Sequence, residues 1–194
     1  MSTKMLVCII GGSGSGKSTL EDEIIIHDGF SKTVSTTTRD KRDGEHNGRE
    51  YHFVDTQTFT KMDDNNELVE SFNFTDNFYG LTKNEFNKSN DHLVFVVEPN
   101  GYVAVSKYIK ENKIEITPIV IYMDIPEKER FKNMIKRGDD PIGVQERLKA
   151  ESIVTDFKKL DIKHDIRVSK LHPSTVEVVM EDIYIALDVI KSEK

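Results

Sequence analysis

The chain has 194 residues, of which 37% are hydrophobic and 31% are charged, a balance typical of one globular domain rather than of a disordered chain. Its 34 acidic and 27 basic residues leave a net charge of −7, which argues against nucleic acid as a partner bound through bulk charge. The single cysteine, Cys8, excludes a disulfide framework and a cysteine-based zinc site. No apolar stretch approaches the roughly 20 residues of a membrane span, so we expect a cytoplasmic protein without a membrane partner.

Short β-branched runs alternate with helical patterns along most of the chain. Strands are expected at residues 5–10, 93–98, 119–123 and 166–168. Helices are expected at residues 17–27, 103–111, 126–136 and 173 to about 190. This alternation predicts an α/β fold in which helices cover both faces of a parallel sheet, giving three layers. The last helix repeats apolar residues at spacings of three and four, typical of a core face, and is also a candidate contact in a homodimer.

Residues 35–90 interrupt the alternation with a polar segment rich in Thr, Asp, Asn and Phe. Tyr51 and Phe53 alternate as in a short strand, and a loop of this length would be unusual inside a compact domain. We therefore expect one domain whose core, residues 1–34 and 92–194, carries an inserted lobe at residues 35–91 with its own small sheet. Residues 139–156 suggest a mobile loop that leads into a short charged helix.

Residues 11–18 read GGSGSGKS and fit the phosphate-loop pattern G-x-x-x-x-G-K-[ST]. The loop follows an apolar strand and opens a helix, so its backbone N–H groups and the helix N-terminus would favour phosphate oxygens. Lys17 would reach the β- and γ-phosphates, and the Ser18 hydroxyl would be a ligand of Mg²⁺. The expected ATP-binding residues are Gly12, Ser13, Gly14, Ser15, Gly16, Lys17, Ser18 and Thr19. This motif predicts a P-loop NTPase fold.

The phosphate loop alone does not distinguish GTPases, ATPases and kinases. A GTPase would normally carry N-K-x-D to read guanine. The nearest strings, at residues 87–90 and 112–115, lack the aspartate. The sequence therefore gives no support for a GTPase.

A second group of phosphate-binding side chains follows at residues 35–53. Arg39 and Arg42 lie three residues apart among hydroxyl groups, and Tyr51 follows; arginine forks match phosphate oxygens. The segment resembles the guanylate kinase family signature S-x-T-T-R-x-x-R-x-G-E-x-x-G-x-x-Y-x-F. The resemblance continues through Glu70 and residues 77–80, 98–101, 137–138 and 147–148, and so covers nearly the whole chain.

This resemblance implies a nucleoside monophosphate kinase that moves the γ-phosphoryl group of ATP to GMP or dGMP, with Mg²⁺ as cofactor. It implies a lid at about residues 137–157. The implied acceptor-binding residues are Ser35, Arg39, Arg42, Tyr51, Glu70, Tyr79, Thr82 and Glu98. The implied catalytic residues are Lys17, Arg42, Arg137 and Arg147. Glu70 would read guanine, whose N1–H and N2–H donors suit a carboxylate, whereas adenine presents an acceptor at N1.

The sequence departs from the family pattern at two positions. Leu81 stands where the family usually has a serine that helps to bind guanine, and Thr82 is a candidate substitute. Val96 stands where the family tends to have the first of two carboxylates, which leaves Glu98. Another or a modified nucleoside monophosphate therefore stays open as the acceptor, because sites that specify by hydrogen bonds depend on each buried pair.

Two further alternatives follow from the same segment. Some domains of this type bind phosphopeptides without catalysis, but they typically have a degraded phosphate loop, whereas Lys17 and Ser18 are intact here. The aromatic residues of the lobe are interpreted as lobe core rather than as a stacking face for the base. They are Phe72, Phe74, Phe78 and Tyr79.

Overall fold

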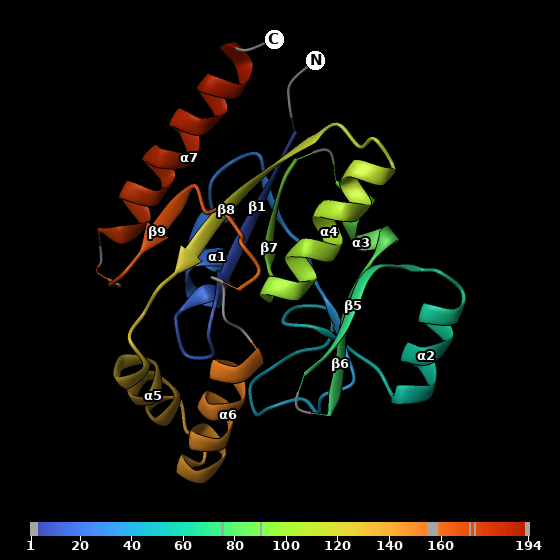
Figure 1. Cartoon of the computed structure of the whole chain (residues 1–194), viewed down its shortest axis with the longest axis vertical. Coiled ribbons are helices and arrows are strands. Elements are labelled where there is room, and N and C mark those ends of the chain that lie inside the picture. The colour runs from blue at the N-terminus through green and yellow to red at the C-terminus, as the bar shows by residue number, and fades with distance from the viewer. Residues whose placement is uncertain are drawn as a thin grey trace.

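The computed structural model describes residues 4–74, 76–89, 91–154, 159–170, 172 and 174–192. A parallel sheet lies at its centre, with five strands in the described part of the chain (Figure 1). In spatial order these are β2 (Phe30–Lys32), β7 (His92–Val96), β1 (Lys4–Gly11), β8 (Ile116–Met123) and β9 (Ile166–Val168). The parallel sheet is confirmed, but β2 was not predicted, because its three residues include a serine and a lysine.

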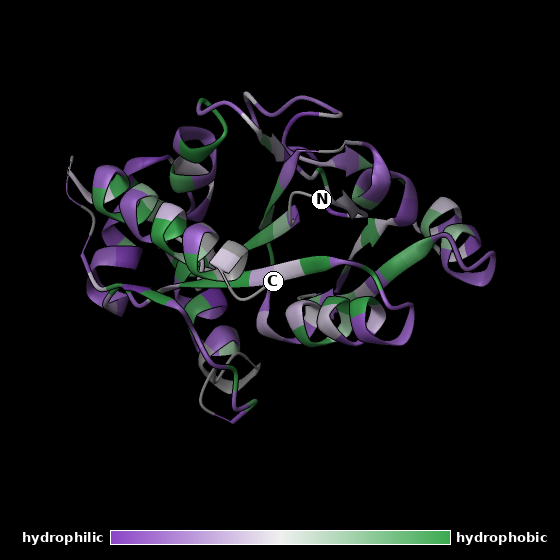
Figure 2. Cartoon of the chain, turned by 90° about the horizontal axis from the view of Figure 1, so that it is seen from above, coloured by the Kyte–Doolittle hydropathy of each residue, from purple (hydrophilic) through white to green (hydrophobic). Residues whose placement is uncertain are grey.

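The faces of the sheet are covered by different helices. Alternate residues of β1 face opposite ways, so that Met5, Val7 and Ile9 join one core cluster and Leu6, Cys8 and Ile10 join the other. The first cluster includes residues of α1 (Lys17–Ile24) and α7 (Thr175–Ser192). The second includes residues of α3 (Lys83–Asn87) and α4 (Pro99–Glu111). The three-layer α/β fold is therefore confirmed, and Figure 2 shows apolar strands between helices with polar outer faces.

The segment that interrupts the alternation forms a second sheet, as expected. Its four described strands, in spatial order, are β4 (His52–Phe53), β3 (Thr36–Thr37), β6 (Asn77–Thr82) and β5 (Leu68–Phe74). Between β4 and β5 lies α2 (Thr56–Asp64), whose buried Phe59 stacks on Phe78 with ring centroids 5.5 Å apart. This sheet packs against α4 through β5 (Figure 1). Residue 90, at the end of the expected segment, lies outside the described residues.

A helix corrects the expected loop at residues 139–156. After α5 (Glu127–Lys136), the chain forms α6 (Pro141–Val154). The Asp140 side chain accepts a hydrogen bond from the Gly143 N–H at 2.8 Å, and proline suits the first turn of a helix. Val144 and Leu148, one turn apart, pack with Met134 of α5. The Asp-Pro start and this apolar spacing were the missed signals.

Two expected segments extend beyond the described residues. Residues 155–157, the end of the implied lid, and residue 173, the expected start of the last helix, are outside them. Among the described helices, none is long and apolar enough to cross a membrane.

Candidate active site

The phosphate loop joins β1 to α1 at the carboxyl end of the central sheet. Gly14 and Gly16 have φ angles of 76° and 88°, a left-handed conformation that favours glycine. Lys17 opens α1, and its Nζ donates to the carbonyl oxygens of Gly11 at 2.6 Å and Gly12 at 3.1 Å. The loop thus holds its lysine beside the N-terminus of a helix, where backbone donors favour anions.

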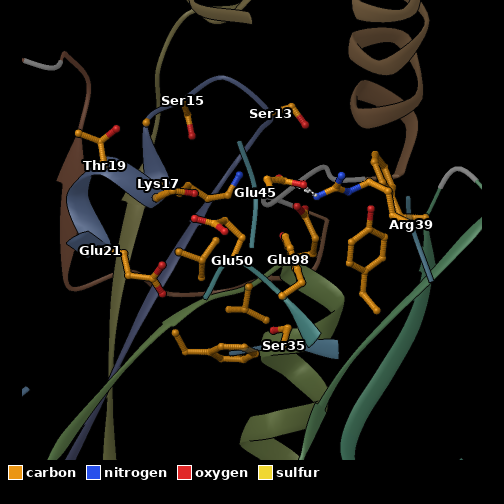
Figure 3. A pocket seen from close by; sticks show the side chains of 18 of the residues that line it. Ser13, Ser15, Lys17, Thr19, Glu21, Ser35, Arg39, Glu45, Glu50 and Glu98 are labelled. Carbon is orange, nitrogen blue, oxygen red and sulfur yellow. Dashed lines mark hydrogen bonds and ion pairs between the residues drawn. The ribbon is translucent and has the colours of Figure 1, made fainter. Parts of the chain in front are cut away.

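A cavity of about 390 Å³ lies between the phosphate loop and the lobe. All five cations expected at the site line it: Lys17, Arg39, Arg42, Arg137 and Arg147. Figure 3 shows Lys17 from α1, Arg39 from the lobe and Glu98 from the start of α4 around the same space. The fold therefore brings together positive side chains that lie up to 130 residues apart, from Lys17 to Arg147.

The two arginines of the lobe that line the cavity differ in how they are held. Both carboxylate oxygens of Glu45 accept from Arg39 Nη2, at 2.9 and 3.0 Å, and the backbone N–H of Arg42 donates to Glu45 at 2.8 Å. Arg39 also lies over the rings of Tyr51 and Phe53, 5.4 and 5.5 Å from their centroids. It is therefore fixed before any ligand binds.

The Arg42 guanidinium is held less closely, since its Nη1 lies 4.0 Å from Glu45 Oε1, and it also lies among other positive charges. Burial lowers the pKa of Arg42, and so do the neighbouring charges of Arg39, Arg147 and Arg137. Asp139 offsets only part of this effect. An anion bound among these arginines would therefore relieve repulsion that the free protein carries.

Glu70 is a buried carboxyl group in the wall of the same cavity. It lies on β5 with 5% of its surface exposed. Burial raises the pKa of Glu70 to about 8, although the backbone N–H of Leu81 donates to the carboxyl group. Among the described residues, Oε2 of Glu70 has no hydrogen-bond partner. A buried acceptor without a partner is costly, so this oxygen is suited to a ligand that brings a donor.

Most of the expected binding residues line the cavity. Beyond the cations and Glu70, they are Ser13, Gly14, Ser15, Gly16, Ser18, Thr19, Ser35, Tyr51, Tyr79 and Glu98. Within the described part of the chain, Gly12 and Thr82 are not among the lining residues. The Thr82 hydroxyl accepts from the Glu85 N–H at 3.1 Å and caps α3.

Residues 3–178 match the sequence model of the family described as Guanylate kinase. A protein of Clostridium tetani with that name is 31% identical over 163 residues, which are 81% of this chain and 71% of that protein. A guanylate kinase of Mycoplasmopsis pulmonis is 35% identical over 146 residues, 70% of this chain and 71% of that protein. This chain belongs to the guanylate kinase family.

A solved structure shows the same fold. The guanylate kinase of Anaplasma phagocytophilum aligns with 97% of this chain and 86% of its own, with a TM-score of 0.61 and 21% identity. The P-loop NTPase fold expected from residues 11–18 is therefore confirmed.

The two departures from the guanylate kinase pattern have different structural outcomes. Leu81 is fully buried in the core cluster beneath α3 and α4, so its side chain supports the fold behind Glu70. At Val96, the backbone N–H donates to the carboxylate of Glu21, one of the residues that line the cavity. A carboxylate therefore stands beside this position although residue 96 does not supply it.

Two residues of the cavity wall were not predicted from the sequence, Glu21 and its partner Lys32. Glu21 lies one turn after Ser18 on α1, and Lys32 Nζ is 2.6 Å from its carboxylate. Burial raises the pKa of Glu21 to about 7, and Lys32 offsets part of this shift. No local pattern marks this pair in the sequence, because the two residues lie on separate elements, α1 and β2.

The aromatic residues of the lobe were assigned too simply to its core. Phe78 does pack against Phe59. Phe72, Phe74 and Tyr79, however, line the cavity, and the rings of Phe72 and Tyr79 stack 5.4 Å apart at 15°. The cavity therefore has an apolar wall beside Glu70, suited to a flat base.

Proposed function

We propose that this member of the guanylate kinase family transfers the γ-phosphoryl group of ATP to GMP or dGMP, giving ADP and GDP or dGDP. The observation that carries this proposal is the pairing of two binding features in one cavity. A buried acceptor, Glu70, and aromatic rings line the same cavity as Arg39 and Arg42 of the lobe and the phosphate loop. A guanine base with a phosphate attached has the complementary donors and charge.

The acceptor's phosphate would be held by the lobe. Arg39, already fixed by Glu45, and Arg42 would donate to its oxygens, with hydroxyl groups from Ser35, Tyr51 and Tyr79 at the same wall. These contacts would orient the attacking oxygen toward the donor. Phosphoryl transfer needs such positioning and charge neutralisation more than it needs a base.

The donor would lie on the phosphate loop. Backbone N–H groups of residues 13–18 and the Lys17 ammonium would bind the β- and γ-phosphates. Arg137 and Arg147, from the end of α5 and from α6, would neutralise the charge that spreads over the transferring group. Lys17, Arg42, Arg137 and Arg147 are therefore the proposed catalytic residues.

A magnesium ion fits this donor set. The Ser18 hydroxyl and the carboxyl groups of Glu21 and Glu98 line the cavity, and Mg²⁺ prefers oxygen ligands while keeping several from water and phosphate. Among the described residues, no cluster of three or more acidic, histidine or cysteine side chains could hold a metal. We propose that Ser18 would contribute one ligand to Mg²⁺, which would supply positive charge that offsets the charge of the phosphates.

The proposed parts of the domain follow from these roles. The core, residues 1–34 and 92–194, would hold ATP; the lobe, 35–91, would hold the acceptor; and a lid, about 137–157, would exclude water during transfer. We also propose that the ligands are small nucleotides rather than nucleic acid. A cytoplasmic location is proposed because the buried thiol of Cys8 needs no oxidising compartment.

The experiment is a panel of nucleoside monophosphates incubated with the protein, ATP and Mg²⁺, with ADP release as the readout. Turnover is expected with GMP and dGMP and at least 100-fold lower kcat/KM with AMP, CMP and UMP, since buried hydrogen bonds discriminate strongly. Lys17→Ala is the matched inactive control. If none of the nucleoside monophosphates is turned over, the kinase assignment is overturned. If a non-guanine acceptor is turned over faster than GMP and dGMP, only the assignment of the base is overturned.

A further inference from the structure

An ion pair between two helices forms hydrogen bonds with the phosphate loop outside the cavity. Arg130 of α5 and Glu151 of α6 are joined by Nη1 and Oε2, 2.6 Å apart. The Ser13 N–H donates to both oxygens of Glu151, at 2.9 and 3.0 Å, and Arg130 Nη1 donates to the Ser13 carbonyl oxygen at 3.3 Å. One residue of the loop is therefore held at both its backbone groups by this pair.

The fit between the loop and α5 leaves little room for movement. A Cβ added at Gly12 would overlap the Arg130 guanidinium, and one at Gly14 would lie 2.5 Å from the Arg130 carbonyl oxygen. Asn133, one turn further along α5, donates from Nδ2 to the Gly14 carbonyl oxygen at 2.8 Å. The side chains of Arg130 and Glu151 are 14% and 3% exposed. The loop and the two helices thus form one packed unit.

Helical spacing connects this pair to the arginines of the cavity. Arg147 precedes Glu151 by four residues on α6, and Arg137 follows Arg130 by seven residues at the end of α5. Residues four and seven apart share one face of a helix. The carboxylate of Asp139 joins the two arginines, 2.6 Å from Arg137 and 4.0 Å from Arg147. Fixing the pair on the loop therefore fixes where both arginines enter the cavity.

We propose that Arg130 and Glu151 are positioning residues for phosphoryl transfer: their ion pair docks α5 and α6 on the phosphate loop and so aims Arg137 and Arg147. In the described part of the chain, neither residue of the pair lines the cavity, so they act through the arginines. Arg130 also neutralises a carboxylate that would otherwise stand beside the phosphates of ATP. The proposal rests on the proposed kinase activity.

Glu151→Gln tests the aiming role, since it keeps the size and an acceptor oxygen but removes the charge. Its kcat is expected to fall about 10- to 100-fold, because small misplacements of positioned groups cost that much, while KM for GMP changes less than about threefold, because the lobe is untouched. Arg130→Met is expected to lower kcat similarly and also to raise KM for ATP, because the negative charge of Glu151 would no longer be neutralised by Arg130. Arg130→Lys, which keeps the charge, is expected to recover part of kcat.

The double variant Arg130→Met/Glu151→Gln supplies the second measurement. If the pair acts as a unit, its kcat is expected to be no lower than that of the worse single variant. The matched control is Arg167→Met, which breaks an exposed pair with Asp124 at the edge of the sheet and is expected to keep the wild-type kcat. Thermal melts and GMP titrations of each variant show that the lobe and core remain folded.

The outcomes separate this proposal from the assigned function. A wild-type protein that phosphorylates no nucleoside monophosphate overturns the function itself. An active wild type with Glu151→Gln and Arg130→Met variants that melt earlier yet keep the wild-type kcat overturns the positioning role, and the pair is then structural only. If either variant fails to fold, Glu151→Asp replaces it: it keeps the charge but shortens the reach, and an unchanged kcat in that variant likewise contradicts the proposal.

Discussion

Glu70 places a titratable group where the base of the acceptor is expected to bind. Its environment favours the neutral acid, because burial raises its pKa to about 8. Guanine donors would favour the ionised form instead. Binding of GMP and loss of the Glu70 proton should therefore be coupled.

This coupling predicts that GMP binding at pH 7 releases about one proton from Glu70, since the free group is mostly protonated there and ionised in the complex. Titration calorimetry in two buffers of different ionisation enthalpy measures the number released. Glu70→Gln should release about one proton fewer and bind GMP more weakly. Equal proton release by both proteins would show that Glu70 does not meet the base.

The raised pKa of Glu70 also makes the stability of the ligand-free protein depend on pH. A carboxyl group whose pKa is raised in the folded state binds more protons folded than unfolded, so its contribution to stability is lost as the pH rises from about 4.5 toward 8. The Glu70→Gln protein should therefore lose less stability than wild type between pH 5 and pH 8. Thermal melts without nucleotide at the two pH values serve as the folding control for the titrations.

At the scale of elements, the predictable parts were those with long apolar runs. β1, fully buried from Met5 to Ile10, and the phosphate loop behind it follow from hydrophobicity and glycine spacing. β2 does not, because only its pairing with β7 makes a three-residue strand of a short polar run. α6 was hidden by its acidic, proline-containing start, although a capping aspartate and a proline are start signals.

The residues of the candidate site that could be predicted are those that belong to a sequence motif. Arg39 and Arg42 were found because both belong to a continuous signature. Glu21 and Lys32 were not, because they belong to separate elements and meet only when α1 packs on the sheet beside β2. A contact of this kind leaves no local pattern to read.

The Thr82 side chain stabilises the start of a helix rather than the base site. Its hydroxyl caps α3, and loss of such a cap costs about 1 kcal/mol. Thr82→Ala is therefore expected to lower stability by roughly that amount while leaving KM for GMP unchanged, and Thr82→Ser is expected to restore stability. Chemical denaturation and steady-state kinetics measure the two effects. A raised KM for GMP at unchanged stability would instead place Thr82 at the base.

At the scale of the whole molecule, the net charge is −7, yet basic side chains gather around the cavity. Of the 27 basic residues, six line it, and they come from the phosphate loop, β2, the lobe, the end of α5 and α6: Lys17, Lys32, Arg39, Arg42, Arg137 and Arg147. The acidic surface elsewhere does not exclude anionic ligands; it favours those small enough to enter this cavity. Nucleotides meet that condition, whereas a polymer would meet the negative surface first.

Concentrating positive charge in this way should cost stability in the free protein. Arg42 is the residue to test, because burial and three other arginines lower its pKa, whereas Arg39 is held by Glu45. Arg42→Met removes one repelling charge and keeps the apolar stem. We expect its melting temperature without ligand to equal or exceed that of wild type, and its activity to fall by at least 100-fold, since one charge-neutralising group at a transition state is worth that much.

The stabilisation caused by ligands then shows whether Arg42 serves to bind a phosphate or to pack the lobe. GMP should raise the melting temperature of the wild type, and guanosine, which lacks the phosphate, should raise it far less, because binding stabilises in proportion to affinity. In Arg42→Met the two ligands should give similar small shifts. A variant that melts well below wild type without ligand would contradict the charge argument, since it would mean that Arg42 holds the lobe together rather than waiting for an anion.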